Sequence, residues 1–328
     1  MDHLPMGVRD QILLLLEEGE GNWVSTEALC KRITVTRSSL SKYISLLKKD
    51  GYRIESSRRR GYLLQEASDL LVPRRIREGL GTRVFGRKEI LYFTETDSTN
   101  IRAKDIAARG ASEGTIVLSE KQTKGRGRKA RNWFSPPRDG IYLSLILRPK
   151  IAPREAPRIT LLTAVAIAET LLSMSGLEIA IKWPNDILAN GKKLAGILTE
   201  MSTKGERINY VVAGLGLNVH TPRFPDEIQG KATSILMETG KQFPRVALAQ
   251  EYLKWHEDYY EVLQSIGFEP IRRRWKELAN IVGQRVTVET IDTEYSGEVQ
   301  DIDNDGALIL KDKTGRSHRI IFGDVTLR

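Results

Sequence analysis

The residues best suited to chemistry lie in a basic, glycine-containing segment at positions 121–136. Six of its first 11 residues are lysine or arginine, and none is acidic. Gly125 and Gly127 let the backbone approach a ligand closely, and the neighbouring arginines supply planar, permanently charged donors for carboxylate and phosphate oxygens. The segment therefore predicts a loop that binds an anion. A mobile, solvated basic loop is the alternative.

This segment belongs to neither common class of nucleotide-binding loop. Gly125, Gly127 and Ala130 have the spacing of the dinucleotide-binding fingerprint. That fingerprint opens a helix, however, whereas Pro136 and Pro137 follow shortly here. No Gly-x-x-x-x-Gly-Lys-Ser/Thr sequence occurs in the chain. A bound nucleotide would have to be held without a Walker loop.

Two further motifs place polar side chains beside strand-like runs. At 182–186 (KWPND), a proline turn presents an amide and a carboxylate that suit a nucleotide or Mg²⁺. At 193–196 (KLAG), a lysine precedes an apolar run, so its ammonium group could face a substrate carboxylate at a pocket mouth. Taken alone, the first motif is more often a hairpin corner, and the lysine of the second is more often simply solvated.

Two weaker motifs complete the set of candidates. Gly214 and Gly216 stand two residues apart beside Asn218, which predicts that something packs closely against this strand-like run. Tight packing between strands would explain the glycines nearly as well. Residues 97–100 (DSTN) are most simply the cap of a following helix, and could also donate to a small ligand.

Composition excludes several classes of protein. The single cysteine, Cys30, permits neither an internal disulfide nor a cysteine-based zinc site, and the four histidines lack metal-ligand spacing. We therefore expect no metal site held by protein side chains alone. No apolar run approaches the roughly 18 residues of a membrane span. The first residues also lack the features of a secretory signal. Together these observations favour a cytoplasmic protein.

Positive charge is concentrated near the N-terminus. Residues 25–62 contain ten basic and three acidic residues, which accounts for most of the net charge of +9. Helical spacing predicts a helix over 6–18, a second from a Thr26 cap to about residue 33, and a third after a Thr36 cap. The alternation after Gly51, with a polar tip at 56–61, predicts a β-hairpin. This is the order of a winged helix-turn-helix.

Such a module is suited to DNA. The third helix would present five side chains to a major groove: Arg37, Ser38, Ser39, Lys42 and Tyr43. The hairpin tip would bring Arg58, Arg59 and Arg60 to phosphates or a minor groove. The alternative is a solvated basic module that docks on another domain.

The rest of the chain divides into a linker, a large domain and a small one. Residues 65–71 are polar and unpatterned, and a new domain begins near Pro73. Strand-like runs at 115–118, 141–147, 179–182 and 211–214 mingle with helical stretches at 99–109, 157–174 and 245–263, which predicts a sheet with packed helices. Short runs at 285–289, 298–302, 307–310 and 319–322 predict a small β-barrel. We therefore expect a multidomain α+β chain with a winged helix over 1–65, an α/β domain over 73–275 and a β domain over 280–328.

In this order, the five motifs resemble those of the biotin protein ligases: DSTN at 97–100, GRGRxxRxWxSP at 125–136, KWPND, KLAG, and GxGxN at 214–218. The resemblance covers essentially the whole chain, because a winged helix precedes the motifs and a β domain follows them. It points to the bifunctional class, the bacterial biotin operon repressors. It also implies a central domain of the biotin/lipoate ligase type with a mixed sheet, followed by an SH3-like β-barrel.

The resemblance implies a biotin–[acetyl-CoA-carboxylase] ligase. Biotin and MgATP would give biotinyl-5′-AMP and pyrophosphate, and biotin would then pass to a lysine of a biotin carboxyl carrier protein. The implied catalytic residues are Arg128 and Lys193, which would offset the repulsion between a carboxylate and a triphosphate. The implied biotin site comprises Ser98, Thr99, Asn100, Gln122, Arg126, Gly127, Arg128 and Lys193. The implied nucleotide side comprises Gly125, Trp133, Asn185, Asp186 and Asn218, with the Mg²⁺ of ATP near Asp186.

Repression of biotin synthesis genes is also implied. The adenylate-bound protein would form a homodimer whose paired winged helices bind a two-half-site operator. The family usually has glycine where Ala130 stands, so a positive φ there would be strained. Two rival functions are a lipoate protein ligase and a transcription regulator whose central domain only senses a small molecule. The intact GRGR and KWPND motifs favour biotin over lipoate.

Overall fold

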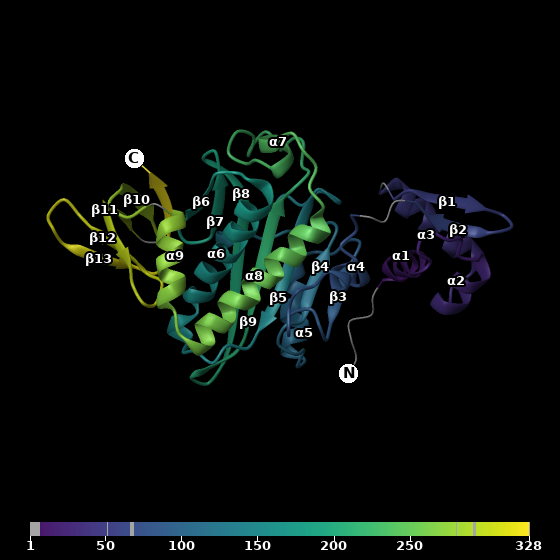
Figure 1. Ribbon diagram of the computed structural model, residues 1–328, viewed down its shortest axis with the longest axis horizontal. Coiled ribbons are helices and arrows are strands. Elements are labelled where there is room, and N and C mark those ends of the chain that lie inside the picture. The colour runs from purple at the N-terminus through teal and green to yellow at the C-terminus, as the bar shows by residue number, and fades with distance from the viewer. Residues whose placement is uncertain (1–6, 51, 66–68, 280, 291–292, 328) are drawn as a thin grey trace.

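The structure is a computed structural model that describes residues 7–50, 52–65, 69–279, 281–290 and 293–327. Three parts follow one another along its long axis (Figure 1): an N-terminal helical module, a central sheet covered by helices, and a small C-terminal β domain. This is the expected multidomain α+β order. The predicted domain limits, 1–65, 73–275 and 280–328, stay a prediction. The last helix of the central part runs to Ala279, and residues 66–68 and 280 lie outside the described residues.

The N-terminal module has the predicted winged-helix order. Its elements are α1 (Val8–Glu18), α2 (Thr26–Ile33), α3 (Arg37–Lys49), β1 (Ile54–Ser57) and β2 (Gly61–Leu64). Leu40, Ile44 and Leu47 of α3 are buried, so the helical spacing correctly predicted its packed face. Met6, the predicted first residue of the first helix, lies outside the described residues.

One of the two predicted helix caps in this module is correct. Thr36 caps α3, because its hydroxyl accepts a hydrogen bond from the backbone N–H of Ser39. The predicted Thr26 cap of α2 is wrong. The cap is Ser25, whose backbone is extended and whose hydroxyl accepts from the backbone N–H of Ala28. Both residues carry a hydroxyl, and only the backbone conformation distinguishes them.

The central domain is built on a seven-stranded mixed sheet. In spatial order its strands are β3 (Ile90–Phe93), β4 (Ile116–Ser119), β5 (Gly140–Leu147), β9 (Arg207–Asn218), β8 (Lys192–Lys204), β7 (Asp186–Ala189) and β6 (Ile179–Lys182). Strands β3 and β4 are parallel and the other described neighbours are antiparallel. The predicted runs at 115–118, 141–147 and 179–182 coincide with β4, β5 and β6, whereas 211–214 is only the middle of β9.

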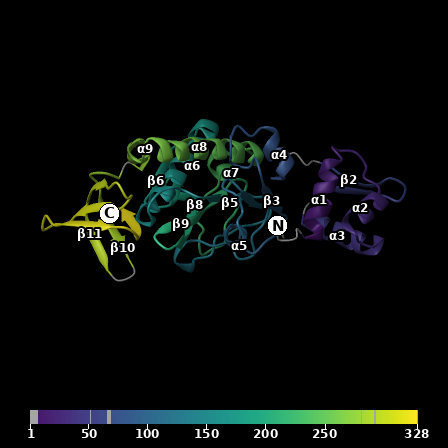
Figure 2. The same ribbon diagram turned by 90° about the horizontal axis from the view of Figure 1, so that it is seen from below.

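Helices cover both faces of this sheet (Figure 2). Helix α5 (Thr99–Ala108) lies on one face, and α6 (Pro157–Ser175), α8 (Arg245–Ser265) and α9 (Glu269–Ala279) lie on the other. By length and composition alone, residues 153–175 could cross a membrane. In this structure α6 is a core helix, because its apolar residues are buried between the sheet and α8. Two short helices, α4 (Pro73–Glu78) and α7 (Ile235–Thr239), lie in the connections.

The C-terminal domain is a five-stranded antiparallel sheet. Its order is β13 (Ser317–Ile320), β12 (Leu308–Lys311), β11 (Glu294–Ile302), β10 (Arg285–Glu289) and β14 (Asp324–Leu327). The four predicted runs fall in or beside β10, β11, β12 and β13. Strand β14 was not predicted, because it contains only two apolar residues, Val325 and Leu327. Its first residue, Asp324, reaches the central domain, as described below.

Buried polar contacts fix the N-terminal module and the linker on the central domain. Asp10 of α1 accepts hydrogen bonds from the backbone N–H and the hydroxyl of Thr94, at 2.6 and 2.8 Å. Burial raises the pKa of the Asp10 carboxyl. Beside the linker, Arg245 pairs with Glu120 at 2.7 Å and with Asp69 at 2.8 Å. Burial alone would lower the pKa of this guanidinium, but the two carboxylates raise it above its usual range.

Replacing Glu120 by leucine is expected to destabilise the central domain by about 3–5 kcal/mol, because Arg245, only 1% exposed, would remain buried without its main partner. Urea unfolding followed by tryptophan fluorescence measures the loss. The control is Glu178→Leu, at an exposed carboxylate of the same domain, which should shift the midpoint little. Equal midpoints for the two variants would contradict the assigned role of the ion pair.

Candidate active site

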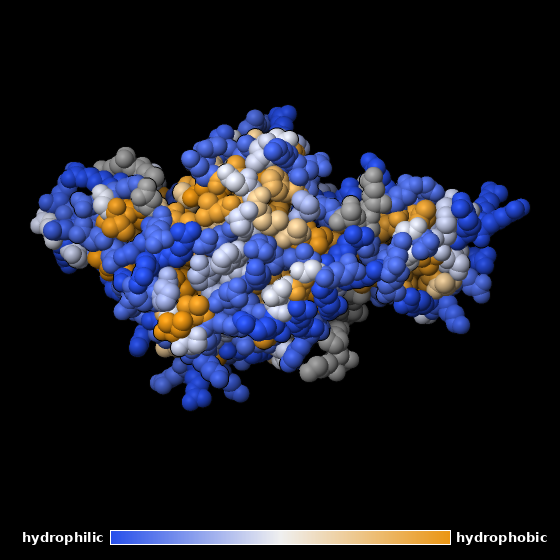
Figure 3. Space-filling model, viewed as in Figure 1, coloured by the Kyte–Doolittle hydropathy of each residue, from blue (hydrophilic) through white to orange (hydrophobic). Residues whose placement is uncertain are grey.

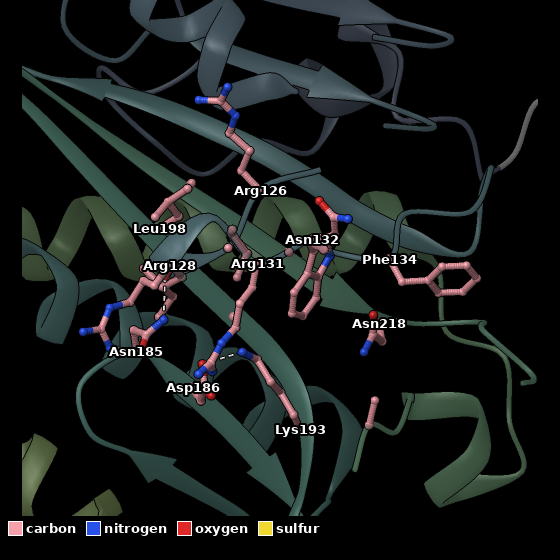
Figure 4. Close-up of a pocket in the computed structure, with 18 of the residues that line it drawn as sticks. Arg126, Arg128, Arg131, Asn132, Phe134, Asn185, Asp186, Lys193, Leu198 and Asn218 are labelled. Carbon is pink, nitrogen blue, oxygen red and sulfur yellow. Dashed lines mark hydrogen bonds and ion pairs between the residues drawn. The ribbon is translucent and has the colours of Figure 1, made fainter. Parts of the chain in front are cut away.

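One cavity of the central domain collects nearly all the predicted ligand-site residues. It lies against β8 and β9, under the basic loop and beside the connection after β9 (Figure 4). The predicted residues that line it are Ser98, Thr99, Asn100, Gln122, Arg126, Gly127, Arg128, Trp133, Asn185, Asp186, Lys193 and Asn218. Gly125 does not line it. The segments that supply these residues come from five separate parts of the sequence.

The basic loop is a structured hairpin-like turn. Gly127 donates its backbone N–H to Arg131 at 2.7 Å, and Trp133 donates to the backbone carbonyl of Gly125 at 2.9 Å. A Cβ on Gly125 would lie 2.5 Å from the carbonyl oxygen of Trp133. This glycine is therefore required by the packing of the loop on itself. Gly125 does not line the cavity, and the predicted ligand contact of its backbone stays a prediction.

Two cations of the pocket are held by polar side chains of the KWPND motif. Arg128 donates to the amide oxygen of Asn185 at 3.0 Å, and Lys193 pairs with Asp186 at 2.7 Å (Figure 4). Burial lowers the pKa of the Arg128 guanidinium, and the nearby carboxylates of Asp324 and Asp186 oppose that shift. Asn185 also donates to the backbone carbonyl of Ile197 at 2.8 Å, so its amide supports Arg128 from a fixed position.

A carboxylate of the C-terminal domain completes this cluster. Asp324, at the start of β14, lies 3.2 Å from Lys129, 2.9 Å from Arg131 and 3.6 Å from Arg128. Burial alone would raise the pKa of Asp324, but the hydrogen bond from Lys129 and the charges of the two arginines lower it. Sequence reasoning missed this residue, since more than 190 positions separate it from the loop and no local pattern marks it.

The paired glycines of β8 and β9 make room for an aromatic ring. Gly196 and Gly216 are opposite one another in the sheet, and a Cβ on either would collide with the indole of Trp133. The ring also lies 5.3 Å from the ammonium group of Lys193. The predicted close approach at Gly216 is therefore made by a side chain of the protein. Trp133 therefore packs on β8 and β9 beside Lys193.

The polar floor of the pocket comes from the start of α5 and from the segment after β4. The backbone N–H of Thr99 donates to the amide oxygen of Gln122 at 2.9 Å. The amide nitrogen of Gln122 donates to the Ser135 hydroxyl at 3.0 Å. Ser98 occupies the N-cap position of α5, within the segment that was predicted to cap this helix. Its side chain makes no capping hydrogen bond, so that part of the prediction is wrong.

Two predicted residues lie apart from the basic cluster. Arg126 is exposed, and its guanidinium points away from Arg128, Asp186 and Lys193 (Figure 4). Arg126 lines the cavity because of its place in the loop, although its guanidinium is turned away from the other cations. Asn218, at the end of β9, donates to the backbone carbonyl of Thr233 at 2.9 Å and thereby ties the strand to the following connection.

That connection contributes lining residues which sequence reasoning missed. Phe224 packs edge-on against Phe134 with ring centroids 6.1 Å apart, and Ile228, Lys231 and Ala232 line the same side. No motif marks these residues, because ordinary apolar and basic side chains on a loop carry no distinctive spacing. Apart from Lys231, these residues add apolar surface to the lining of the pocket.

No group of three or more His, Cys, Asp or Glu side chains within the described residues could hold a metal ion. Asp186 is the carboxylate of the predicted nucleotide side, and it is already paired with Lys193. A single carboxylate fits a cation that arrives with a nucleotide better than a resident metal.

The predicted DNA surface is only partly exposed. Arg37, Ser38 and Lys42 of α3 are exposed, whereas Ser39 and Tyr43 are half-buried. Arg58, Arg59 and Arg60 occupy the exposed β1–β2 turn at the far end of the molecule, which is hydrophilic (Figure 3). The guanidinium of Arg60 lies 4.1 Å from the ring centroid of Trp23, so an aromatic side chain holds one of the three tip arginines.

Comparisons with known proteins assign a family to each part of the chain. The models that match are an HTH domain at 8–63, the biotin/lipoate A/B protein ligase family at 91–218, and the biotin protein ligase C-terminal domain at 281–328. The bifunctional ligase/repressor BirA of Bacillus subtilis is 36% identical over 310 residues, which cover 94% of this chain and 95% of that protein.

Two further comparisons agree. BirA of Escherichia coli is 30% identical over 318 residues, covering 97% of this chain and 96% of that protein. The solved structure of a biotin protein ligase from Aquifex aeolicus, in complex with biotin and ATP, matches with a TM-score of 0.64 and 26% identity. It covers 74% of this chain and 99% of that one.

Ala130 offers a test of the loop conformation. It has φ +56° and Lys129 has φ +52°, a region that costs a non-glycine residue roughly 1–2 kcal/mol. The strain expected at Ala130 is thus present. Ala130→Gly should relieve part of it and slow tryptic cleavage of the loop by about threefold to fivefold, since the ordered form gains up to ~1 kcal/mol.

The matched control is Ala152→Gly, at a loop alanine with an ordinary φ of −71°, which should not slow this cleavage. Faster cleavage of the Ala130→Gly protein would contradict the conformation described for the loop.

Proposed function

Since the chain belongs to the bifunctional biotin ligase/repressor family, we propose that the pocket joins biotin to ATP and that the product controls DNA binding. The protein is a biotin–[acetyl-CoA-carboxylase] ligase and a biotin-responsive repressor. The observation that carries the assignment to this pocket is the convergence of Arg128 and Lys193 on one wall of it, each held by a fixed polar partner.

In the first half-reaction, a carboxylate oxygen of biotin forms a bond to the α-phosphorus of ATP. The bond from that phosphorus to the bridging oxygen breaks, and pyrophosphate leaves. Both reactants are anions, so Arg128 and Lys193 offset their repulsion and hold the reacting atoms in line. Each of these cations supplies about 2–4 kcal/mol of transition-state stabilisation, the magnitude typical of one preorganised donor. Mg²⁺ bound to ATP, near Asp186, would neutralise phosphate charge.

In the second half-reaction, the amine of a lysine on the biotin carboxyl carrier protein attacks the acyl carbon of biotinyl-5′-AMP. An amide forms, the acyl–oxygen bond breaks, and AMP leaves with its phosphate oxygen. The mixed anhydride must be protected from water in the meantime. The basic loop, with Trp133 against the paired glycines, is placed to cover it.

We assign the biotin side to Ser98, Thr99, Asn100, Gln122, Arg126 and Gly127, with Arg128 and Lys193 at its carboxylate end. The nucleotide side comprises Asn185, Asp186 and Asn218, together with the apolar wall of Phe134 and Phe224. Gly125 and Trp133 shape the loop between the two sides. This assignment is supported by the lining of the cavity and by the solved relative with biotin and ATP.

Repression requires two winged helices on one operator. We propose that the adenylate-bound chain forms a homodimer in the cytoplasm, because a closed twofold pair matches a two-half-site operator. Sedimentation of the full chain with and without the adenylate measures this association. The predicted DNA contacts are the exposed residues of α3 and the three arginines of the β1–β2 turn (the wing), Arg58, Arg59 and Arg60.

Arg128→Met and Lys193→Met are each expected to lower kcat/KM for adenylate formation by about 30-fold to 1000-fold, the range that corresponds to 2–4 kcal/mol. Pyrophosphate release in the presence of biotin and ATP measures the rate. Arg273→Met, at an exposed arginine of α9, is the control and should retain the wild-type rate.

The same preparation, given a carrier domain, also separates the rival functions. Attachment of biotin to the carrier supports the biotin ligase, and attachment of lipoate would indicate a lipoate ligase. No transfer to the carrier would indicate a transcription regulator that only senses a small molecule. Wild-type rates in both pocket variants would contradict the clamp role of the two cations.

For the repressor, replacing Arg58, Arg59 and Arg60 together by alanine is expected to weaken operator binding and to reduce the salt slope by about 0.9 for each phosphate that is no longer neutralised. Binding measured across a salt titration gives both quantities, and ligase activity should be unchanged. The matched control replaces three exposed cations of the C-terminal domain, Lys311, Lys313 and Arg316. Unchanged affinity and slope in the wing variant would exclude the proposed role of these arginines.

A further inference from the structure

A chain of hydrogen bonds runs beneath the pocket from β8 to the start of α5. The amide nitrogen of Asn100 donates to a carboxylate oxygen of Glu200 and to the backbone carbonyl of Leu198, both at 3.0 Å. The amide oxygen of Asn100 lies 2.6 Å from the hydroxyl of Ser144, a fully buried residue of β5. That hydroxyl lies 2.8 Å from the hydroxyl of Thr99, which lines the pocket.

The orientation of the Asn100 amide is set by its two acceptors. A carboxylate oxygen and a backbone carbonyl only accept hydrogen bonds, so the group facing them must be the NH₂. The amide oxygen consequently faces Ser144. Both N–H groups of Asn100 are used within the protein, so on the biotin side this residue supports Thr99 and does not donate its amide hydrogens to the ligand. Gly214 of β9 leaves the space for it, because a Cβ there would collide with the Asn100 amide.

This orientation fixes the hydrogen of Ser144. A serine hydroxyl has one hydrogen to donate, and the buried amide oxygen of Asn100 requires a donor at 2.6 Å. The Ser144 hydrogen therefore points at Asn100. The Thr99 hydroxyl has two acceptors within reach, the Ser144 oxygen at 2.8 Å and the amide oxygen of Gln122 at 3.2 Å. If its hydrogen turned to Gln122, lone pairs of Thr99 and Ser144 would face each other at 2.8 Å and repel, so we assign the Thr99 hydrogen to the shorter contact with Ser144.

We infer that Ser144 and Glu200 are positioning residues that turn the Thr99 hydroxyl into a hydrogen-bond acceptor toward the substrate. With its own hydrogen directed at Ser144, Thr99 presents only lone pairs to the cavity. A substrate N–H is the matching group, and each nitrogen of the ureido ring of biotin carries one. This inference rests on the proposed function, because it concerns the same pocket and names what one of its walls recognises.

Glu200 acts at the far end of the same chain. Its other carboxylate oxygen pairs with Lys104 of α5 at 2.7 Å, so the residue joins β8 to the helix that begins with Thr99. Without Glu200, the carbonyl of Leu198 would still favour the same amide orientation. The effect of removing Glu200 is therefore smaller than that of removing Ser144.

A double-mutant cycle tests the inference through the dissociation constant of biotin, measured by titration calorimetry on the full chain. Ser144→Ala is expected to raise this constant about tenfold in the wild-type background, because the Thr99 hydrogen loses its acceptor at 2.8 Å and keeps only the longer contact with Gln122. In a Thr99→Val background, the same substitution should raise it less than about twofold, since no hydroxyl remains to be oriented.

Two further variants complete the experiment. Thr170→Val removes a buried hydroxyl of α6 that bonds only its own helix, at 2.9 Å, and should leave the biotin affinity unchanged. If Ser144→Ala fails to fold, Glu200→Leu replaces it in the cycle with an expected effect of about threefold, and Glu200→Gln should recover most of that loss.

Equal effects of Ser144→Ala in the two backgrounds would overturn the inference, because Ser144 would then act on packing alone. An unchanged biotin affinity in the Ser144→Ala protein would overturn it as well. If wild-type protein binds no biotin, the proposed function fails together with the inference. If wild-type protein binds biotin and the cycle is additive, only the inference fails.

Discussion

Cations that must bind two anions have to be held close together before either anion arrives. In this molecule Arg128, Lys129 and Arg131 share the carboxylate of Asp324, and Lys193 is paired with Asp186. These partners offset the repulsion between neighbouring positive charges and keep the side chains near the cavity. The organisation of the pocket depends on this arrangement, because preorganised charge stabilises a transition state without reorganisation at the moment of reaction.

The same cluster of charges links the C-terminal domain to the central domain. The C-terminal domain supplies the carboxylate that the basic loop requires, so it is part of the pocket as well as an appendage. At the other end, Asp10 of the winged helix bonds Thr94, a few residues before the polar floor begins at Ser98. The winged helix thus contacts the central domain four residues before the first residue that lines the pocket.

The sequence predicted the parts of this structure that are marked by local patterns. Periodicity located α3, α6 and α8, and the glycine, arginine and KWPND motifs located most of the cavity. Contacts between distant segments could not be predicted in this way. Asp324 stands in a short strand with no motif, Phe224 lies on an ordinary loop, and no local pattern marks that Arg126 points away from the cluster. Asn185 was predicted as a ligand group from the sequence, and only the structure shows that it also supports Arg128.

Mass spectrometry of the purified full chain, mixed with biotin, ATP and Mg²⁺ and with no acceptor protein, tests the central claim most directly. If the basic cluster brings the two anions together, biotinyl-5′-AMP and pyrophosphate appear in amounts comparable to the protein, and lipoate in place of biotin gives no adenylate. A folded protein that yields no adenylate from biotin would contradict the account.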